Sequence, residues 1–228
     1  MRPIVHVAVA ILLAGLAVPA GARDTDSRWP ACANEGGAHA LDARIAACTA
    51  IIEAARETPE NLALAYNNRG WAHNDGKSYA LALADLDRAI RLNPRLVWAW
   101  NNRGNTHGGR GDHLRAIADY EEAIRLDPAF ANAYNGRGFS RLNLRDYARA
   151  RADFSEAIRL DPGLVFAWRN RARGYEAQGD LVRALADHRE AVRLAPADAD
   201  ALADLCRLLT RTSPAAAETR RLCGSASR

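Results

Sequence analysis

Apolar and small residues recur along most of the chain at the spacing that an α-helix places on one face. In one such segment the apolar face contains Leu83, Leu86, Ala89 and Ile90, at successive spacings of three, three and one residues. This is the pattern of an amphipathic helix. Helix-length segments of this kind follow one another in pairs, and each pair ends at a proline that cannot continue a helix. The pattern predicts an all-α chain built from antiparallel helix pairs.

The helix pairs are copies of one unit with a period of 34 residues. The phrase Ala-Tyr-Asn-Asn-Arg-Gly begins at Ala65 and returns in altered form from Ala99, Ala133 and Ala167. The second half of the unit repeats in the same register. Its alanine, apolar, alanine and proline positions are first occupied by Ala82, Leu86, Ala89 and Pro94. A fixed period of this length indicates a supersecondary unit copied in tandem, and therefore a solenoid.

The combination of an aromatic residue, a glycine four residues later, an alanine, an apolar residue and a proline resembles the tetratricopeptide repeat. The resemblance covers about residues 60–212. It implies a right-handed superhelical solenoid of antiparallel helix pairs, and a groove lined by the first helix of each pair.

The solenoid pattern also divides the chain. We expect a signal peptide at 1–22, an N-terminal arm at 23–37, a capping helix at 38–61, four repeat units at 62–198 (about 63–96, 97–130, 131–164 and 165–198), and a partial fifth unit with a C-terminal cap at 199–228. In the capping helix, Ala47, Ile51, Ala54 and Pro59 match the pattern of a second helix. A last short helix is expected to begin at Ser213-Pro214.

The N-terminal segment predicts export. Arg2 precedes an apolar stretch from residue 4 to 18, and Ala20-Gly21-Ala22 fits a small-residue cleavage site. The alternative is an uncleaved N-terminal anchor. No later segment is apolar enough to cross a bilayer, so we expect no membrane insertion after cleavage. The alanine- and arginine-rich composition favours a bacterial periplasmic or secreted protein.

The four cysteines lie near the two ends of the repeat array. In an oxidising compartment they allow three pairings. Their placement favours Cys32 with Cys48 and Cys206 with Cys223, so that each disulfide closes a local loop at one end of the solenoid. The alternative is free, buried thiols. The spacing contains no Cys-x-x-Cys pair and argues against zinc.

The charge balance excludes an obvious nucleic-acid partner. The formal net charge is +4, and removal of residues 1–22 takes away only Arg2, which leaves +3. The sequence contains no long basic run and no recognition-helix motif, so we expect no nucleic acid as partner.

The spacing of the first helices predicts which residues line the groove. Trp98, Asn101 and Asn105 share one face in the second unit, and equivalent residues follow in the others. The predicted binding residues are Asn67, Asn68, Trp71, Trp98, Asn101, Asn102, Asn105, Asn135, Phe139, Phe166, Arg169, Asn170 and Arg173.

Asparagine amides can pair with the main chain of an extended peptide, and the aromatic rings add apolar anchors. The row of Asn68, Asn102 and Asn170 resembles the asparagine ladder of O-linked N-acetylglucosamine transferases, although Gly136 interrupts it. The alternative is that these asparagines bond to neighbouring helices and only maintain the stacking.

A second row of polar residues predicts ion pairs inside the solenoid. Arginines at 69, 103, 137 and 171 are each followed 16 residues later by an aspartate. This constant separation indicates a repeated Arg–Asp pair between the two helices of a unit, in a partly dry site. His73 and His107 occupy one repeat position without a third metal ligand nearby, and His188 stands at an apolar position where a core histidine is expected.

No catalytic motif with the required context is present, so we expect no enzyme, no cofactor and no metal site. The predicted function is a protein- or peptide-binding adaptor that uses the solenoid groove. The alternatives are a structural subunit that assembles through the convex face or the solenoid ends, and a metal-dependent accessory protein or enzyme.

Overall fold

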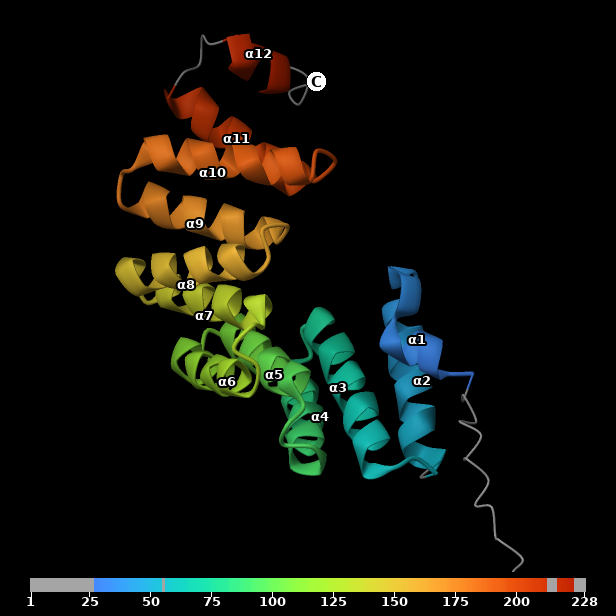
Figure 1. Cartoon of the computed structure of the whole chain (residues 1–228). Coiled ribbons are helices and arrows are strands. Elements are labelled where there is room, and N and C mark those ends of the chain that lie inside the picture. Colours follow the sequence, from blue (N-terminus) through green and yellow to red (C-terminus); the bar gives the residue numbers. More distant parts are fainter. Residues whose placement is uncertain (1–26, 55, 213–216, 224–228) are drawn as a thin grey trace, which may run out of the picture.

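The computed structural model describes residues 27–54, 56–212 and 217–223. The regular elements within these ranges are all helices, joined by short turns. The predicted signal segment 1–22 and the predicted helix start at Ser213-Pro214 lie outside the described residues. The prediction of an all-α solenoid is confirmed, with consecutive helices packed in antiparallel pairs that stack into a curved array (Figure 1).

The repeat units each supply one first helix and one second helix. The pairs are α3 (Pro59–Asp75) with α4 (Tyr79–Leu92), α5 (Val97–Gly109) with α6 (His113–Leu126), α7 (Ala131–Asn143) with α8 (Tyr147–Leu160), and α9 (Val165–Ala177) with α10 (Leu181–Leu194). Before them lie α1 (Trp29–Ala33), a 3₁₀ turn (Glu35–Gly37) and α2 (Leu41–Ala54); after them lie α11 (Ala199–Thr212) and α12 (Ala217–Cys223).

The turns inside the second and fourth pairs, between α5 and α6 and between α9 and α10, follow from a few residues. Gly111 and Gly179 adopt the left-handed conformation, with φ of 83° and 78°, which glycine reaches without a steric penalty. The next residues, Asp112 and Asp180, accept a hydrogen bond from the backbone N–H three residues on and so cap the second helix. These residues reverse the chain and start the second helix at the same point in both units.

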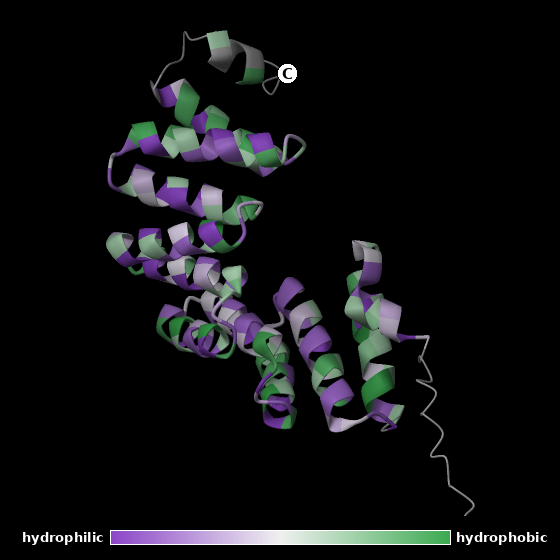
Figure 2. Cartoon of the chain, viewed as in Figure 1, coloured by the Kyte–Doolittle hydropathy of each residue, from purple (hydrophilic) through white to green (hydrophobic). Residues whose placement is uncertain are grey.

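The core lies between the two helices of a pair, where small residues allow close approach. A Cβ at Gly70 would lie 2.8 Å from the Leu86 side chain, and one at Gly138 would lie 2.7 Å from the Phe154 ring. The repeated alanines on both helices are fully buried. Figure 2 shows hydrophobic and hydrophilic residues alternating along the helices, as amphipathic elements require.

The N-terminal cap corrects one detail of the predicted register. Pro59 does not follow a second helix as the repeat prolines do, because it occupies the first turn of α3, with Thr58 as N-cap. α3 therefore begins a turn earlier, relative to the repeat glycine, than the other first helices. The buried residues of α2 are Arg44, Cys48 and Ile51, and Ala47 packs against this core from a partly buried position.

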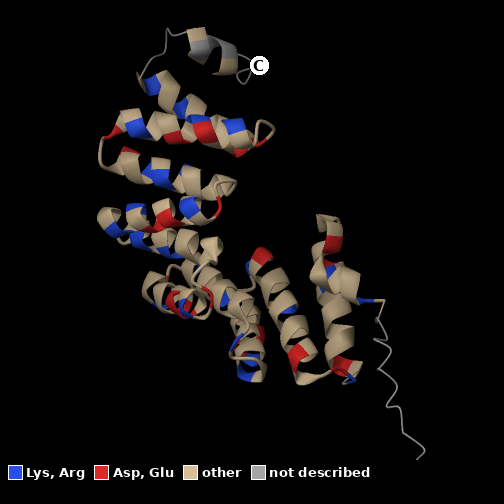
Figure 3. Cartoon of the chain, in the orientation of Figure 1, with Lys and Arg blue, Asp and Glu red and all other residues tan. Residues whose placement is uncertain are grey.

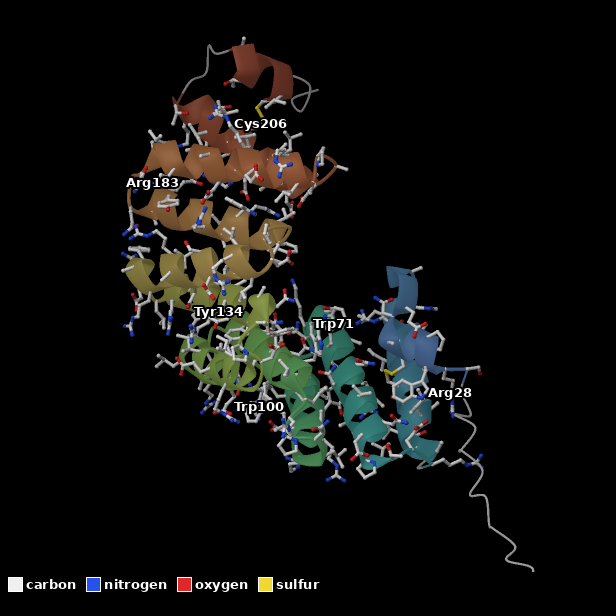
Figure 4. All side chains as sticks on the ribbon, viewed as in Figure 1. Arg28, Trp71, Trp100, Tyr134, Arg183 and Cys206 are labelled. Carbon is white, nitrogen blue, oxygen red and sulfur yellow. A yellow bond between two sulfur atoms is a disulfide. The ribbon has the colours of Figure 1, made fainter. Side chains whose placement is uncertain are left out.

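Both ends of the solenoid carry a disulfide. Cys32 of α1 is bonded to Cys48 of α2, and Cys206 of α11 is bonded to Cys223 of α12, which is the pairing that the sequence favoured (Figure 4). The first disulfide holds a short helix inside the range predicted as an arm. In the chain-entropy model, each loop of this length stabilises the fold by about 3 kcal/mol.

The helices in the described ranges are all too short or too polar to cross a membrane.

Candidate functional site

The aromatic residues predicted for the groove remain open to solvent. Trp71, Trp98, Phe139 and Phe166 are 42%, 50%, 40% and 60% exposed. We call these four side chains, one from the first helix of each repeat unit, the aromatic row. Large rings are normally buried when a chain folds, so a row of exposed rings on equivalent helices makes this surface a candidate for an interaction.

Neighbouring side chains hold two members of the row in place. The Trp98 ring meets Phe130 edge-on, with 4.7 Å between ring centroids. The guanidinium of Arg44 lies 5.1 Å from the centroid of Trp71 and is itself bonded to Asp75 at 2.7 Å. Figure 4 labels Trp71 on α3. These contacts orient the rings while leaving much of their surface free.

The asparagines behave differently from the aromatic row, because they bond one another. Asn102 Nδ2 donates to Asn67 Oδ1 at 3.0 Å, and Asn170 Nδ2 donates to Asn135 Oδ1 at 3.0 Å. Each bond joins the first helices of successive units. Asn67, Asn102 and Asn170 are more than 90% buried. These amides are therefore engaged inside the solenoid. Their hydrogen bonds link neighbouring first helices, which is the arrangement expected if the asparagines maintain helix stacking.

We call these side-chain bonds between successive first helices the stacking ladder. Other residue types continue it at both ends of the solenoid. Arg169 stands at the Asn67 position of the fourth unit and donates to Asp204 of α11 through Nε and Nη2, at 3.1 and 3.0 Å. At the other end, Asn68 Nδ2 lies 4.0 Å from Cys32 Sγ. The predicted binding residue Arg169 is thus buried in a helix-to-helix ion pair, and Asn68 contacts the N-terminal disulfide.

Gly136 interrupts the ladder for a steric reason. A Cβ there would lie 2.5 Å from the ring of Tyr120, which fills the space between α5 and α7. The missing side chain leaves Asn101 Oδ1 buried without a hydrogen-bond partner among the described residues. The Tyr120 hydroxyl donates to Asn105 Oδ1 at 2.7 Å, and burial raises the pKa of Tyr120.

Asn105 is the predicted amide that stays exposed. Its Oδ1 accepts the Tyr120 bond, while its Nδ2 donates to no described residue. It therefore offers a donor beside the aromatic row.

The C-terminal end of the first-helix face is a cluster of charges. Arg173 and Arg207 are partly exposed and bond the more deeply buried carboxylates of Asp204 and Glu176, at 3.0 and 2.9 Å. These four residues line an open hollow. The buried ring of His188 contacts Glu176 at 2.9 Å, in agreement with the expectation of a core histidine.

The carboxylates of this cluster stay ionised in spite of their surroundings. Burial would raise the pKa of Glu176, but hydrogen bonds from Arg207 and His188 hold it below its ordinary value. Burial would likewise raise the pKa of Asp204, but Arg173 and Arg169 hold it below its ordinary value. Arg173, a predicted binding residue, is thus partly committed to the cluster.

The predicted Arg–Asp pairs are confirmed in all four units. Each arginine forms two hydrogen bonds with the aspartate 16 residues later: Arg69–Asp85, Arg103–Asp119, Arg137–Asp153 and Arg171–Asp187. The same guanidinium also lies over an aromatic ring of its own helix, as Arg103 does over Trp100 at 4.8 Å. Its remaining nitrogen reaches the preceding unit, as Arg103 reaches Asp87 at 2.7 Å.

His73 and His107 lie beside these pairs. Their Nε2 atoms are 3.9 and 3.8 Å from Asp85 and Asp119. Burial lowers the pKa of both histidines, and the nearby aspartates only partly oppose this effect. No group of side chains that could hold a metal ion occurs in the part of the chain that the structure describes.

Comparison with protein families assigns this architecture. Two family models described as tetratricopeptide repeat match residues 63–96 and residues 101–165 and 140–199. Together they cover more than half of the 228 residues. The chain belongs to the tetratricopeptide repeat family, and its fold is that family's right-handed solenoid of antiparallel helix pairs.

Solved structures agree with the fold. A thermophilic tetratricopeptide repeat protein from Thermus thermophilus, TTC0263, is 19% identical, with a TM-score of 0.66 over 74% of this chain and 90% of that chain. The crystal structure of MamA gives 21% identity and a TM-score of 0.57 over 70% of this chain and 91% of that one. The comparison with curated proteins finds no match.

Proposed function

We propose that this protein is a scaffold that binds an extended segment of a partner protein along the aromatic row, without catalysing a reaction. The tetratricopeptide repeat fold suggests a protein-binding role in general. The observation that carries the specific proposal is the aromatic row itself, with four rings on equivalent helices that are 40–60% exposed.

The proposed mode of binding differs from main-chain capture by asparagines. Because most ladder amides already bond one another, the affinity comes chiefly from apolar contact with Trp98, Phe139 and their neighbours. Aromatic residues of this kind are the commonest energetic anchors of protein interfaces. Asn105 adds a side-chain donor, Nδ2, for a carbonyl of the bound segment. The ladder and the Arg–Asp pairs hold the first helices rigid, so little ordering is needed on binding.

We further propose that the scaffold works in an exported compartment, in a bacterial cell envelope. The sequence of residues 1–22 supports this placement. Two disulfides support it as well, because such bonds persist mainly outside the reducing cytosol.

The test is a selection of peptides from a displayed library on the full chain, followed by affinity measurements. Selected peptides should bind a Trp98→Ser/Phe139→Ser variant about tenfold more weakly or worse, since removing an aromatic anchor typically costs about 2 kcal/mol. A Leu114→Ser/Val182→Ser variant is the matched control, because it removes two exposed apolar residues from second helices. If the selected peptides bind wild type and the aromatic-row variant with equal affinity, the binding surface is not the aromatic row.

A further inference from the structure

The four repeat units provide an internal comparison, and one of them departs from the others in charge. The end of the second helix and its following turn occupy residues 88–95, 122–129, 156–163 and 190–197. The first of these stretches has three arginines and no acidic residue, a net charge of +3. The second and third each have one arginine and two acidic residues, net −1, and the fourth has one of each, net 0.

Because of this difference in charge, the first unit lacks an ion pair that the other three units contain. In those units the arginine near the helix end is bonded to a glutamate three residues earlier: Glu122–Arg125, Glu156–Arg159 and Glu190–Arg193. In α4 the place of the glutamate is taken by Arg88, so Arg91 has no such partner. The turn changes in the same direction, because Asn93 replaces the aspartate of the second and third units, and Arg95 replaces a small residue.

Arg88, Arg91 and Arg95 are exposed, and their guanidinium groups form no ion pair with any described residue. We call these three residues the α4 basic edge. The acidic residues of α4 are already used, because Asp85 pairs with Arg69 and Asp87 with Arg103.

On the adjoining helix, exposed Glu60 forms no ion pair with the three arginines in the described structure. Figure 3 shows the resulting concentration of basic residues at the lower end of α4. A separation of three residues places Arg88 and Arg91 on one side of the last turns of α4, and Arg95 follows in the turn after the helix end.

We propose that the α4 basic edge is a second docking site, which binds a short acidic segment of a partner protein. Each guanidinium can form two hydrogen bonds with one carboxylate, and no carboxylate of the unit neutralises these three. The size of the patch favours a few carboxylates over a larger anionic surface. Recognition of anionic lipid uses clusters of about four to eight basic residues, and duplex DNA often engages about six to ten phosphate contacts. The site lies at the end of a second helix and in the turn that follows it, whereas the aromatic row lies on first helices.

The experiment measures binding of a fluorescein-labelled hexaglutamate peptide to the full chain by fluorescence anisotropy at low ionic strength. Arg88→Glu is the informative variant, because it installs the residue that the other units carry and gives Arg91 a neighbour for an ion pair. We expect about tenfold weaker binding and an unchanged or higher Tm. Arg110→Glu is the matched control, since Arg110 is exposed, has no ion-pair partner among the described residues and gives the same change in net charge.

Three results would overturn the proposal. One is equal binding of wild type and Arg88→Glu. Another is an equal loss of hexaglutamate binding in Arg110→Glu, which would show that the effect comes from the net charge of the protein and not from the α4 basic edge. The third is that phosphatidylglycerol vesicles or a 20-base-pair duplex, and not hexaglutamate, bind in a manner that depends on Arg88. If Arg88→Glu folds poorly, an Arg91→Gln/Arg95→Gln variant measures the same loss without introducing an acid.

Discussion

At the scale of single residues, the repeat uses arginine where an apolar residue could fill the same space. Each of Arg69, Arg103, Arg137 and Arg171 binds an aspartate of its own unit and lies over an aromatic ring. The aspartate side chains are less than 10% exposed. A buried carboxylate of this kind depends on its partner, because an unpaired charge in a partly dry site is costly.

Substitution of one such arginine tests this dependence. Arg103→Ala should lower the free energy of unfolding by roughly 3–5 kcal/mol, because Asp119 loses a buried partner. The control is Arg125→Ala, which removes an exposed pair with Glu122 and should cost about 0–1 kcal/mol. Urea denaturation followed by circular dichroism measures both. Equal, small losses in the two variants would contradict the burial of the Arg103–Asp119 pair.

His73 and His107 predict the pH dependence of stability. Their pKa values are lowered by burial in the folded protein, so the unfolded chain takes up protons first as the pH falls through about 6.5. Stability should therefore fall on acidification from pH 7.5 to 5.5. A His73→Gln/His107→Gln variant should show a shallower loss of Tm over this range. Parallel curves for variant and wild type would assign the pH dependence to other groups.

At the scale of helices, the stacking ladder explains why the first helices form a continuous row. The sequence revealed the members of this ladder but not their role, since the 34-residue period gives equal support to an open row and a bonded one. The outcome depends on the separation of successive helices, which brings Asn67 and Asn102 within 3.0 Å. By contrast, the separation of 16 residues predicted the Arg–Asp pairs, because it relates two helices whose pairing the turn already sets.

The break at Gly136 gives a test of the ladder. Gly136→Asn alone should lower the free energy of unfolding by about 1–3 kcal/mol, because its Cβ meets the Tyr120 ring at 2.5 Å. Combined with Tyr120→Leu, the residue type of the first unit, the new amide can donate to Asn101 Oδ1. The double variant should be more stable than the sum of the two single changes by about 0.5–3 kcal/mol. An additive double-mutant cycle would show that the break is not due to Tyr120.

At the scale of the whole molecule, the 34-residue period of the sequence predicted the solenoid. The positions of the cysteines favoured the two disulfides that the structure contains, one at each end of the solenoid. The start of α3 was not predicted, because Pro59 was assigned to the position of a proline that follows a second helix, whereas Thr58 and Pro59 form the N-cap and first turn of α3. The charge cluster around Glu176 also depends on the placement of α11, which brings Arg207 to that carboxylate.

The indole N–H signals of the five tryptophans can show whether a partner segment lies on the aromatic row. Trp71 and Trp98 belong to the row, and their indole N–H groups bond no described residue. Trp29, Trp100 and Trp168 donate to Glu57, Pro94 and Pro162 and serve as internal controls.

The measurement is a titration of the ¹⁵N-tryptophan-labelled full chain with a peptide from the displayed library, followed by NMR. If the peptide lies on the aromatic row, the signals of Trp71 and Trp98 shift while the other three stay in place. A shift confined to Trp29, Trp100 or Trp168, with Trp71 and Trp98 unchanged, would contradict binding on the aromatic row.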